Sequence, residues 1–224
     1  MRWASLLLLS AASVECAILG IDVGSEFLKV ASVRPGTPFH IVLDEQSKRK
    51  VQNVIGFDVE ERVFGNHASQ MLVRKSQKAF TMMNRLLGKK LDSPDVAFFR
   101  ERYYPYDFVE IEGRQGAVGL KLGETIYSPE ELVGMLLQYV LKIASDDAEA
   151  PVKDAVLTVP DYWTQVERQA LLDAADLAGI NVLSLINENT ASESEPLRSS
   201  LSLFLSCLIT SKPIILPFLC RLFS

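Results

Sequence analysis

Two short apolar runs, separated by an amphipathic segment, form the clearest pattern in the chain. The first run, Ala155 to Val159, is too short for a helix and ends at Pro160, so it predicts a buried strand. Apolar residues then recur at helical spacing from about Gln165 to Ala178, and Gly179 follows where a helix C-cap belongs. The second run, Val182 to Ile186, predicts another buried strand. Together they predict a strand-helix-strand unit of an α/β fold.

The two predicted strands are almost wholly apolar, as expected where helices cover both faces of a sheet. Pro160 and Glu188 come directly after them. Because open α/β sheets bind ligands at the carboxyl ends of their strands, Glu188 is the first residue that we expect to take part in chemistry.

A second pattern lies near the N-terminus. Ile18 to Val23 is an apolar run, and a turn leads from it into an alternating strand from Phe27 to Val33. Glycine in this turn lets backbone N–H groups approach an anion, and Ser25 adds a hydroxyl. Asp22 could orient a water on Mg²⁺, which prefers oxygen ligands. Taken alone, this short motif favours an ordinary hairpin.

The middle of the chain predicts a smaller α/β region. Residues 66–87 suit two short helices broken near Ser76, and the aromatic-rich segment from Leu91 to Tyr106 suits the core of a small subdomain. A capping box at Ser128, with proline next, opens a long helix to about Ala148. Further strands are predicted at Phe39 to Leu43, Val54 to Phe57, Val63 to Phe64, Phe108 to Ile111, Ala117 to Leu122 and Thr125 to Tyr127.

Composition and charge narrow the class of protein. The 224 residues are 48% hydrophobic and 23% charged, which is ordinary for a soluble fold with a packed core. The net charge of −5 argues against a nucleic-acid partner, because such binding needs clustered Lys and Arg. The three cysteines, Cys16, Cys207 and Cys220, lie near the two ends, so the body of the fold needs no disulfide.

The N-terminal and C-terminal segments differ in composition from the rest of the chain. Residues 1–16 combine Arg2 with a Leu-rich core and resemble a secretory signal peptide, with a buried first strand as the alternative. Residues 192–224 are predicted to be an aberrant hydrophobic tail, with a C-terminal anchor as the alternative. No uninterrupted apolar run there approaches the ~20 residues of a membrane span, so no span is expected. The remaining domain is assigned to residues 17–191.

Three motifs resemble one family in their order and spacing. They are IDVGSEFLKVASV (Ile21 to Val33), ERVFGNHASQ (Glu61 to Gln70) and TVPDYWTQVERQALLDAADLAGINVLSLINENTA (Thr158 to Ala191). All three are similar to segments of the seventy-kilodalton heat-shock (Hsp70) chaperones. The sequence Gly24-Ser25-Glu26 is most similar to that of the large endoplasmic-reticulum branch, the hypoxia-upregulated or glucose-regulated chaperones. The resemblance covers Ile18 to about Ala191 and therefore only the N-terminal part of such a protein.

The resemblance implies an actin-like (ribonuclease H-like) ATPase fold, with this chain supplying an incomplete lobe one. It implies ATP and Mg²⁺ as cofactors. It assigns cofactor binding to Gly24, Ser25 and Glu26, and the magnesium side to Asp22. It places Glu188 near the attacking water, Asn84 in the catalytic lysine position, and Pro160 and Arg168 in an interdomain relay.

Three departures from the family pattern bear on activity. Glu26 puts a carboxylate facing the phosphates where the family usually has a second hydroxyl. Asn189 replaces a proline after Glu188, which we expect to loosen the strand end. Asn84 puts an amide where a lysine is expected, and charge stabilisation at the phosphoryl group is the main work of such sites. Whether the chain hydrolyses ATP therefore stays open.

The sequence thus predicts an ATP-binding chaperone of the endoplasmic-reticulum lumen that assists protein folding and the stress response. Unfolded client proteins and other heat-shock chaperones are the expected partners. The family's second phosphate loop and adenosine pocket have no match here, so weak or absent ATP binding is expected of this chain alone. Two alternatives stay open: a nucleotide-exchange or holdase co-chaperone with little hydrolysis, and a nonfunctional fragment.

Overall fold

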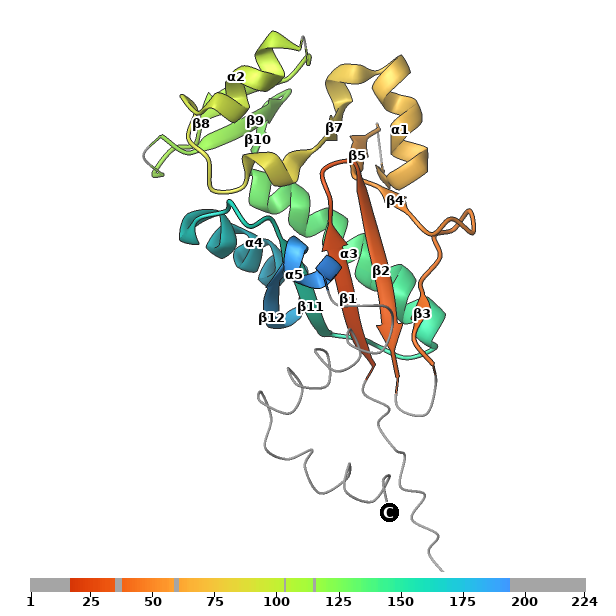
Figure 1. The fold of residues 1–224 in the computed structure, drawn as a ribbon. Helices are drawn as coiled ribbons and strands as arrows, with labels where there is room; N and C mark the ends of the chain where they lie inside the picture. Colours follow the sequence, from red (N-terminus) through yellow and green to blue (C-terminus); the bar gives the residue numbers. More distant parts are fainter. Residues whose placement is uncertain (1–16, 35–37, 59–60, 103, 115, 194–224) are drawn as a thin grey trace, which may run out of the picture.

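The computed structural model describes residues 17–34, 38–58, 61–102, 104–114 and 116–193 (Figure 1). The predicted signal peptide, residues 1–16, and residues 194–224 of the predicted tail lie outside these ranges. Within the described ranges, no helix combines the length and the apolar character needed to cross a membrane.

One mixed sheet carries the parts of the fold that matter for the site. Its strands follow the order β12-β11-β1-β2-β3, and β4 also pairs with β2. The neighbours β1, β11 and β12 are parallel, so their carboxyl ends meet at one edge of the sheet (Figure 1). The strands are β1 (Ile18–Val23), β2 (Phe27–Val33), β3 (His40–Ile41), β4 (Val51–Gln52), β11 (Asp154–Val159) and β12 (Asn181–Asn187).

Two helices, α3 (Pro129–Ala148) and α4 (Gln165–Leu177), cover one face of this sheet (Figure 1). Every second residue of β1 points into the core that they share with the sheet, with Leu19, Ile21 and Val23 at most 2% exposed. The predicted capping box of α3 is confirmed. Ser128 Oγ accepts from the Glu131 N–H at 3.2 Å, and Glu131 Oε2 accepts from the Ser128 N–H at 2.7 Å. The predicted strand-helix-strand unit is confirmed as β11, α4 and β12.

The other face of the sheet differs from the expectation that helices cover both. Among the described residues it carries an apolar groove. Phe39 and Ile41 lie in this groove and are 44% and 39% exposed. Of the helices in the described ranges, only α5 (Glu188–Glu193), which follows β12 directly, adds a residue, Ala191, to the groove lining.

The smaller region holds two three-stranded sheets with a helix near each (Figure 1). One sheet has the order β6-β5-β7 and packs with α1; the other has the order β10-β9-β8 and lies beside α2. Their elements are β5 (Val54–Phe57), β6 (Arg62–Phe64), α1 (Gly65–Arg74), η1 (Ser76–Lys78), β7 (Ala79–Thr81), η2 (Met83–Leu86), α2 (Pro94–Glu101), β8 (Asp107–Glu110), β9 (Val118–Leu122) and β10 (Thr125–Tyr127).

Two sequence predictions for this region, and one for the central sheet, need correction. The second short helix within 66–87 is wrong, because residues 79–81 form β7 and pair with β5, and only a 3₁₀ turn follows. Burial of all three β7 residues in that pairing overrides their helical spacing. Helix α2 was missed, although Ser93 caps it and Pro94 opens it. In the central sheet, strand β3 spans only His40–Ile41 instead of the predicted Phe39 to Leu43.

Candidate functional site

A pocket of about 520 Å³ lies at the carboxyl ends of β1, β11 and β12. It gathers side chains from segments that are far apart in the sequence. Most of the residues that the sequence singled out meet here. The lining consists of Asp22, Gly24, Ser25, Lys29, Asn84, Thr158, Pro160, Tyr162, Glu188 and Ala191.

The turn between β1 and β2 forms one rim of the pocket. Gly24 is required there because a Cβ atom at this position would lie 2.5 Å from the carbonyl oxygen of Phe27. Ser25 is exposed next to it and lines the pocket. A tight glycine turn of this kind can present backbone N–H groups to an anion, and the serine hydroxyl adds a further donor.

Two buried amides support this turn from inside the fold. Asn53 and Asn84 are each 3% exposed. Asn53 Nδ2 donates to the carbonyl of Gly24 at 2.8 Å and to Asn84 Oδ1 at 3.3 Å. Asn84 Nδ2 donates to the carbonyl of Val23 at 3.1 Å. The residue in the predicted lysine position therefore holds the turn through neutral hydrogen bonds. Asn53 was missed, although an asparagine directly before the apolar strand Val54–Phe57 was a visible signal.

Asp22 stands at the end of β1 with both carboxylate oxygens occupied. Thr158 Oγ1 donates to Asp22 Oδ1 at 2.8 Å, and Lys29 Nζ lies 2.6 Å from Asp22 Oδ2. Neither Lys29 nor Thr158 was predicted as a site residue. The hairpin alternation could have indicated Lys29, because it is the direct partner of Asp22 in the β1–β2 register.

Glu188 follows β12 and faces the same pocket. Burial raises the pKa of Glu188, and the negative charges of Asp22 and Asp161 raise it further, whereas Lys29 acts in the opposite direction. The expectation that Asn189 loosens the strand end is not supported, because its amide donates a hydrogen bond to Asp161. A carboxyl with a raised pKa in a cleft is typical of a functional site.

Two predicted site residues lie outside the pocket lining. Glu26 is exposed and lines a separate hollow with Gln52 and Tyr104, outside the lining of the Asp22 pocket. Arg168 lies on α4, outside the pocket lining. Its Nη2 donates to Asn187 Oδ1 at 2.8 Å and its Nε donates to the carbonyl of Trp163 at 3.1 Å, which links the end of β12 to the turn after β11.

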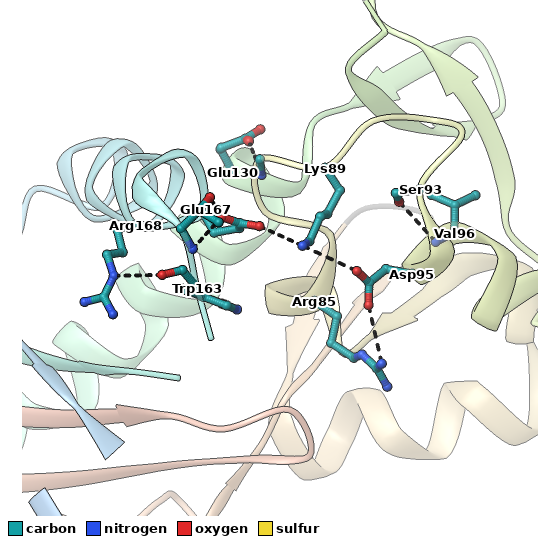
Figure 2. A network of polar contacts seen from close by, with 11 residues as sticks. Arg85, Lys89, Ser93, Asp95, Val96, Glu130, Trp163, Glu167 and Arg168 are labelled. Atoms are coloured by element: carbon teal, nitrogen blue, oxygen red, sulfur yellow. Dashed lines mark hydrogen bonds and ion pairs between the residues drawn. The ribbon is translucent and has the colours of Figure 1, made fainter. Parts of the chain in front are cut away.

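Polar contacts join the first turn of α4 to residues 85–95, as Figure 2 shows. Glu167 accepts from Lys89 Nζ at 2.7 Å, and its other oxygen accepts from the backbone N–H and the hydroxyl of Thr164. Lys89 also lies 3.5 Å from Asp95 at the start of α2. The start of α4, the segment after Asn84 and the start of α2 are thus joined through one partly buried ionic network.

The donor set fits a magnesium nucleotide. The described part of the chain has no group of three or more His, Cys, Asp or Glu arranged to hold a metal ion. Mg²⁺ is often bound by one or two carboxylates, with phosphates and water completing its shell. Asp22 and Glu188 supply such carboxylates, and the Gly24–Ser25 turn supplies groups for phosphate.

Comparison with known proteins agrees with this geometry. The family model described as Hsp70 protein matches residues 18–193. Hypoxia up-regulated protein 1 of Xenopus laevis is 47% identical over 82% of this chain, and the proteins of that name from Gallus gallus and Homo sapiens are 44% and 41% identical over 78% and 82%. The chain spans 28% of the Xenopus protein and 18% of each of the other two.

These matches confirm the resemblance to Hsp70 chaperones and to their hypoxia-upregulated branch. They also confirm the predicted fold class, the actin-like α/β ATPase domain, and the described elements are consistent with part of its first lobe. The chain belongs to the Hsp70 protein family.

Proposed function

We propose that the chain supplies part of the ATP-binding domain of a chaperone of the endoplasmic-reticulum lumen. The observation that carries this proposal is the convergence of Asp22, Ser25 and Glu188 on one pocket at the carboxyl edge of the central sheet. The whole protein assists protein folding under stress, and its partners are unfolded client proteins and other heat-shock chaperones. The family match and the relatives named hypoxia up-regulated protein 1 support this reading.

The residues of the pocket divide the work of holding a nucleotide. Ser25 and the backbone of its turn bind phosphate oxygens. Asp22 holds the magnesium side, and Glu188 orients a water near the phosphate. Pro160 and Arg168 form the proposed interdomain relay, which the bonds of Arg168 to Asn187 and Trp163 support. Bound ATP supplies the phosphoanhydride chemistry.

One observation favours slow hydrolysis, or a role as a nucleotide-exchange or holdase co-chaperone. Asn84 has no charge, and its amide is already bonded to Asn53 and to the carbonyl of Val23. A phosphoryl group gains its main stabilisation from fixed positive charge, and this position provides no charge for the ligand. We therefore propose that the pocket favours nucleotide binding over rapid turnover.

Calorimetric titration of the 224-residue chain with Mg-ATP tests the nucleotide function. The described residues supply one wall of a pocket, so few contacts offset the entropy of immobilising the ligand. We expect weak binding, with a Kd on the order of 1 mM, and its loss in Ser25→Ala combined with Glu188→Gln. Micromolar binding, or binding unaffected by these changes, would show that the site has been misplaced.

The proposed location rests on residues outside the described ranges and on the relatives. We propose that residues 1–16 direct the chain into the secretory pathway and are removed there, and that residues 197–224, beyond the end of α5 at Glu193, add no part to the folded domain. Sequencing the N-terminus of the protein recovered from cells tests the first point, which a mature chain beginning at Met1 would contradict. Equal resistance of residues 197–224 and of α3 to limited proteolysis would contradict the second.

A further inference from the structure

The pocket contains a cation to which the family resemblance assigns no role. Lys29 is the only Lys or Arg among the described residues that line it. It lies on β2 directly opposite Asp22 on β1, and paired positions of adjacent strands place their side chains on the same face of a sheet. Its Nζ accordingly reaches Asp22 Oδ2 at 2.6 Å. This lysine is therefore part of the pocket wall.

No other residue of the described pocket lining can supply a positive charge to a phosphate in place of Lys29. Asp22 and Glu188 are both acidic, and a phosphate chain would add further negative charge at the same place. Asn84 is neutral, and its amide is already bonded to Asn53 and to a carbonyl of the turn. A charged donor to a phosphate oxygen is stronger than a neutral one. Among the lining residues, only Lys29 can be that donor.

The ion pair with Asp22 leaves Lys29 free to change partner. The side chain of Lys29 is 53% exposed and that of Asp22 is 31% exposed. An ion pair this exposed contributes little to folding. A lysine ammonium also sits on a flexible four-carbon stem. Lys29 can therefore exchange one oxygen partner for another within the pocket without loss of the fold.

We infer that Lys29 supplies the phosphate-binding positive charge of this pocket, in place of the lysine that the family resemblance expects at position 84. This inference rests on the proposed nucleotide function. In the structure, Lys29 forms an ion pair with Asp22. When a phosphate chain is present, the Lys29 ammonium donates to a phosphate oxygen, and Asp22 becomes available to the metal side. The exchange breaks and forms hydrogen bonds only.

The test compares four forms of the 224-residue chain: wild type, Lys29→Met, Lys29→Arg and Lys75→Met. Lys75 is a matched control, because it forms a similarly exposed ion pair with Asp58 at 2.8 Å and does not line this pocket. Each form is titrated with metal-free tripolyphosphate and with Mg-ATP, and binding is followed by amide NMR shifts. Thermal unfolding of each form shows whether the fold is retained.

We expect Lys29→Met to weaken tripolyphosphate binding about tenfold, the usual scale for losing one charged hydrogen bond at a partly exposed site. Lys29→Arg keeps the charge and should stay close to wild type. Lys75→Met should bind as wild type does. The melting temperatures of all four should be similar, because both ion pairs are exposed.

A double-mutant cycle separates direct contact from an effect through Asp22. If Lys29 donates to phosphate, Asp22→Asn releases it and should strengthen metal-free tripolyphosphate binding several-fold. The same change in a Lys29→Met background should strengthen it less. A lysine that only positions Asp22 would produce the opposite pattern: Lys29→Met would weaken Mg-ATP binding and leave tripolyphosphate binding unchanged. That pattern would overturn the inference.

Equal tripolyphosphate binding by wild type and Lys29→Met would also overturn it. If that equal binding is measurable and maps to the pocket, the role of Lys29 alone is wrong and the nucleotide pocket stands. If no form binds either probe, the proposed nucleotide function of this chain fails together with the role of Lys29.

Discussion

Asn84 is a buried amide at the inner wall of the pocket, and both ends of its side chain are bonded. Its Nδ2 faces the carbonyl of Val23, and its Oδ1 faces the amide of Asn53. A side chain that is donor at one end and acceptor at the other fits both partners at once. A lysine, which can only donate, would leave Asn53 Nδ2 with Gly24 as its one remaining acceptor among these bonds. The departure from the family pattern thus comes with a matching local network.

Two substitutions of Asn84 test this network. Asn84→Ala removes both bonds and should lower the free energy of unfolding by about 1–3 kcal/mol, because buried partners are left unsatisfied. Asn84→Asp should be more costly, since a carboxylate would face the Val23 carbonyl in a site that is 3% exposed. Urea unfolding at neutral pH measures both values. Wild-type stability in Asn84→Asp would contradict the hydrogen-bond assignment.

At this scale, the sequence predicted some site residues and missed others for a physical reason. Asp22, Gly24 and Ser25 belong to one contiguous turn, so a local motif reveals them. Lys29 and Thr158 reach Asp22 from two different strands. Lys29 lies in the same hairpin as Asp22, so its place follows from the β1–β2 register, which needs the exact turn length. The place of Thr158 depends on β11 lying next to β1, which is a property of strand order and not of any local pattern.

At the scale of elements, the sequence predicts a helix or strand correctly when the contacts that stabilise it are local in the chain. It fails when those contacts come from distant residues. Helix α3 was predicted with its bounds because its capping box and its stripe of apolar residues are local signals. Strand β7 was mistaken for helix because its pairing with β5 brings together residues about 25 positions apart. Helix α4 was also predicted, but the attachment of its first turn to residues 85–95 was not.

Glu167 makes that attachment testable through pH (Figure 2). Burial raises the pKa of Glu167, but hydrogen bonds from Lys89 and Thr164 outweigh it and lower the pKa to about 2. A carboxyl with a lowered folded-state pKa adds stability above its ordinary value of 4.5, and that stability is lost as pH falls towards 2. Glu167→Gln should therefore be less stable than wild type by about 1–3 kcal/mol at neutral pH.

The stability difference between wild type and Glu167→Gln should stay constant from neutral pH to about 4.5 and then shrink towards pH 2. Glu112→Gln, at an exposed turn, is the control and should change stability by less than about 0.5 kcal/mol. Chemical unfolding across this pH range gives the result. A difference that already disappears near neutral pH would contradict the ion pair with Lys89.

At the scale of the whole molecule, the two faces of the central sheet differ among the described residues: helices cover one, and the other carries a groove. Helices α3 and α4 cover one face of the central sheet, while the opposite face bears the apolar groove with Phe39 and Ile41. The pocket opens at the carboxyl edge of the same sheet.

The chain spans 18 to 29% of the length of the relatives that it matches. Chaperone activity and client binding are therefore proposals about the whole protein, and the pocket is the part testable in this chain.

The central claim is the location of the nucleotide pocket, and mapping Mg-ATP by amide NMR shifts on the labelled 224-residue chain tests it most directly. This method detects weak binding, so it does not depend on high affinity. We predict that the largest shifts fall on Asp22 to Ser25, Thr158 and Glu188. A second hollow of about 520 Å³, lined by Lys90 and Gln169, provides an internal comparison and should show small shifts. Shifts concentrated in that second hollow, or no shifts at saturating Mg-ATP, would contradict the account.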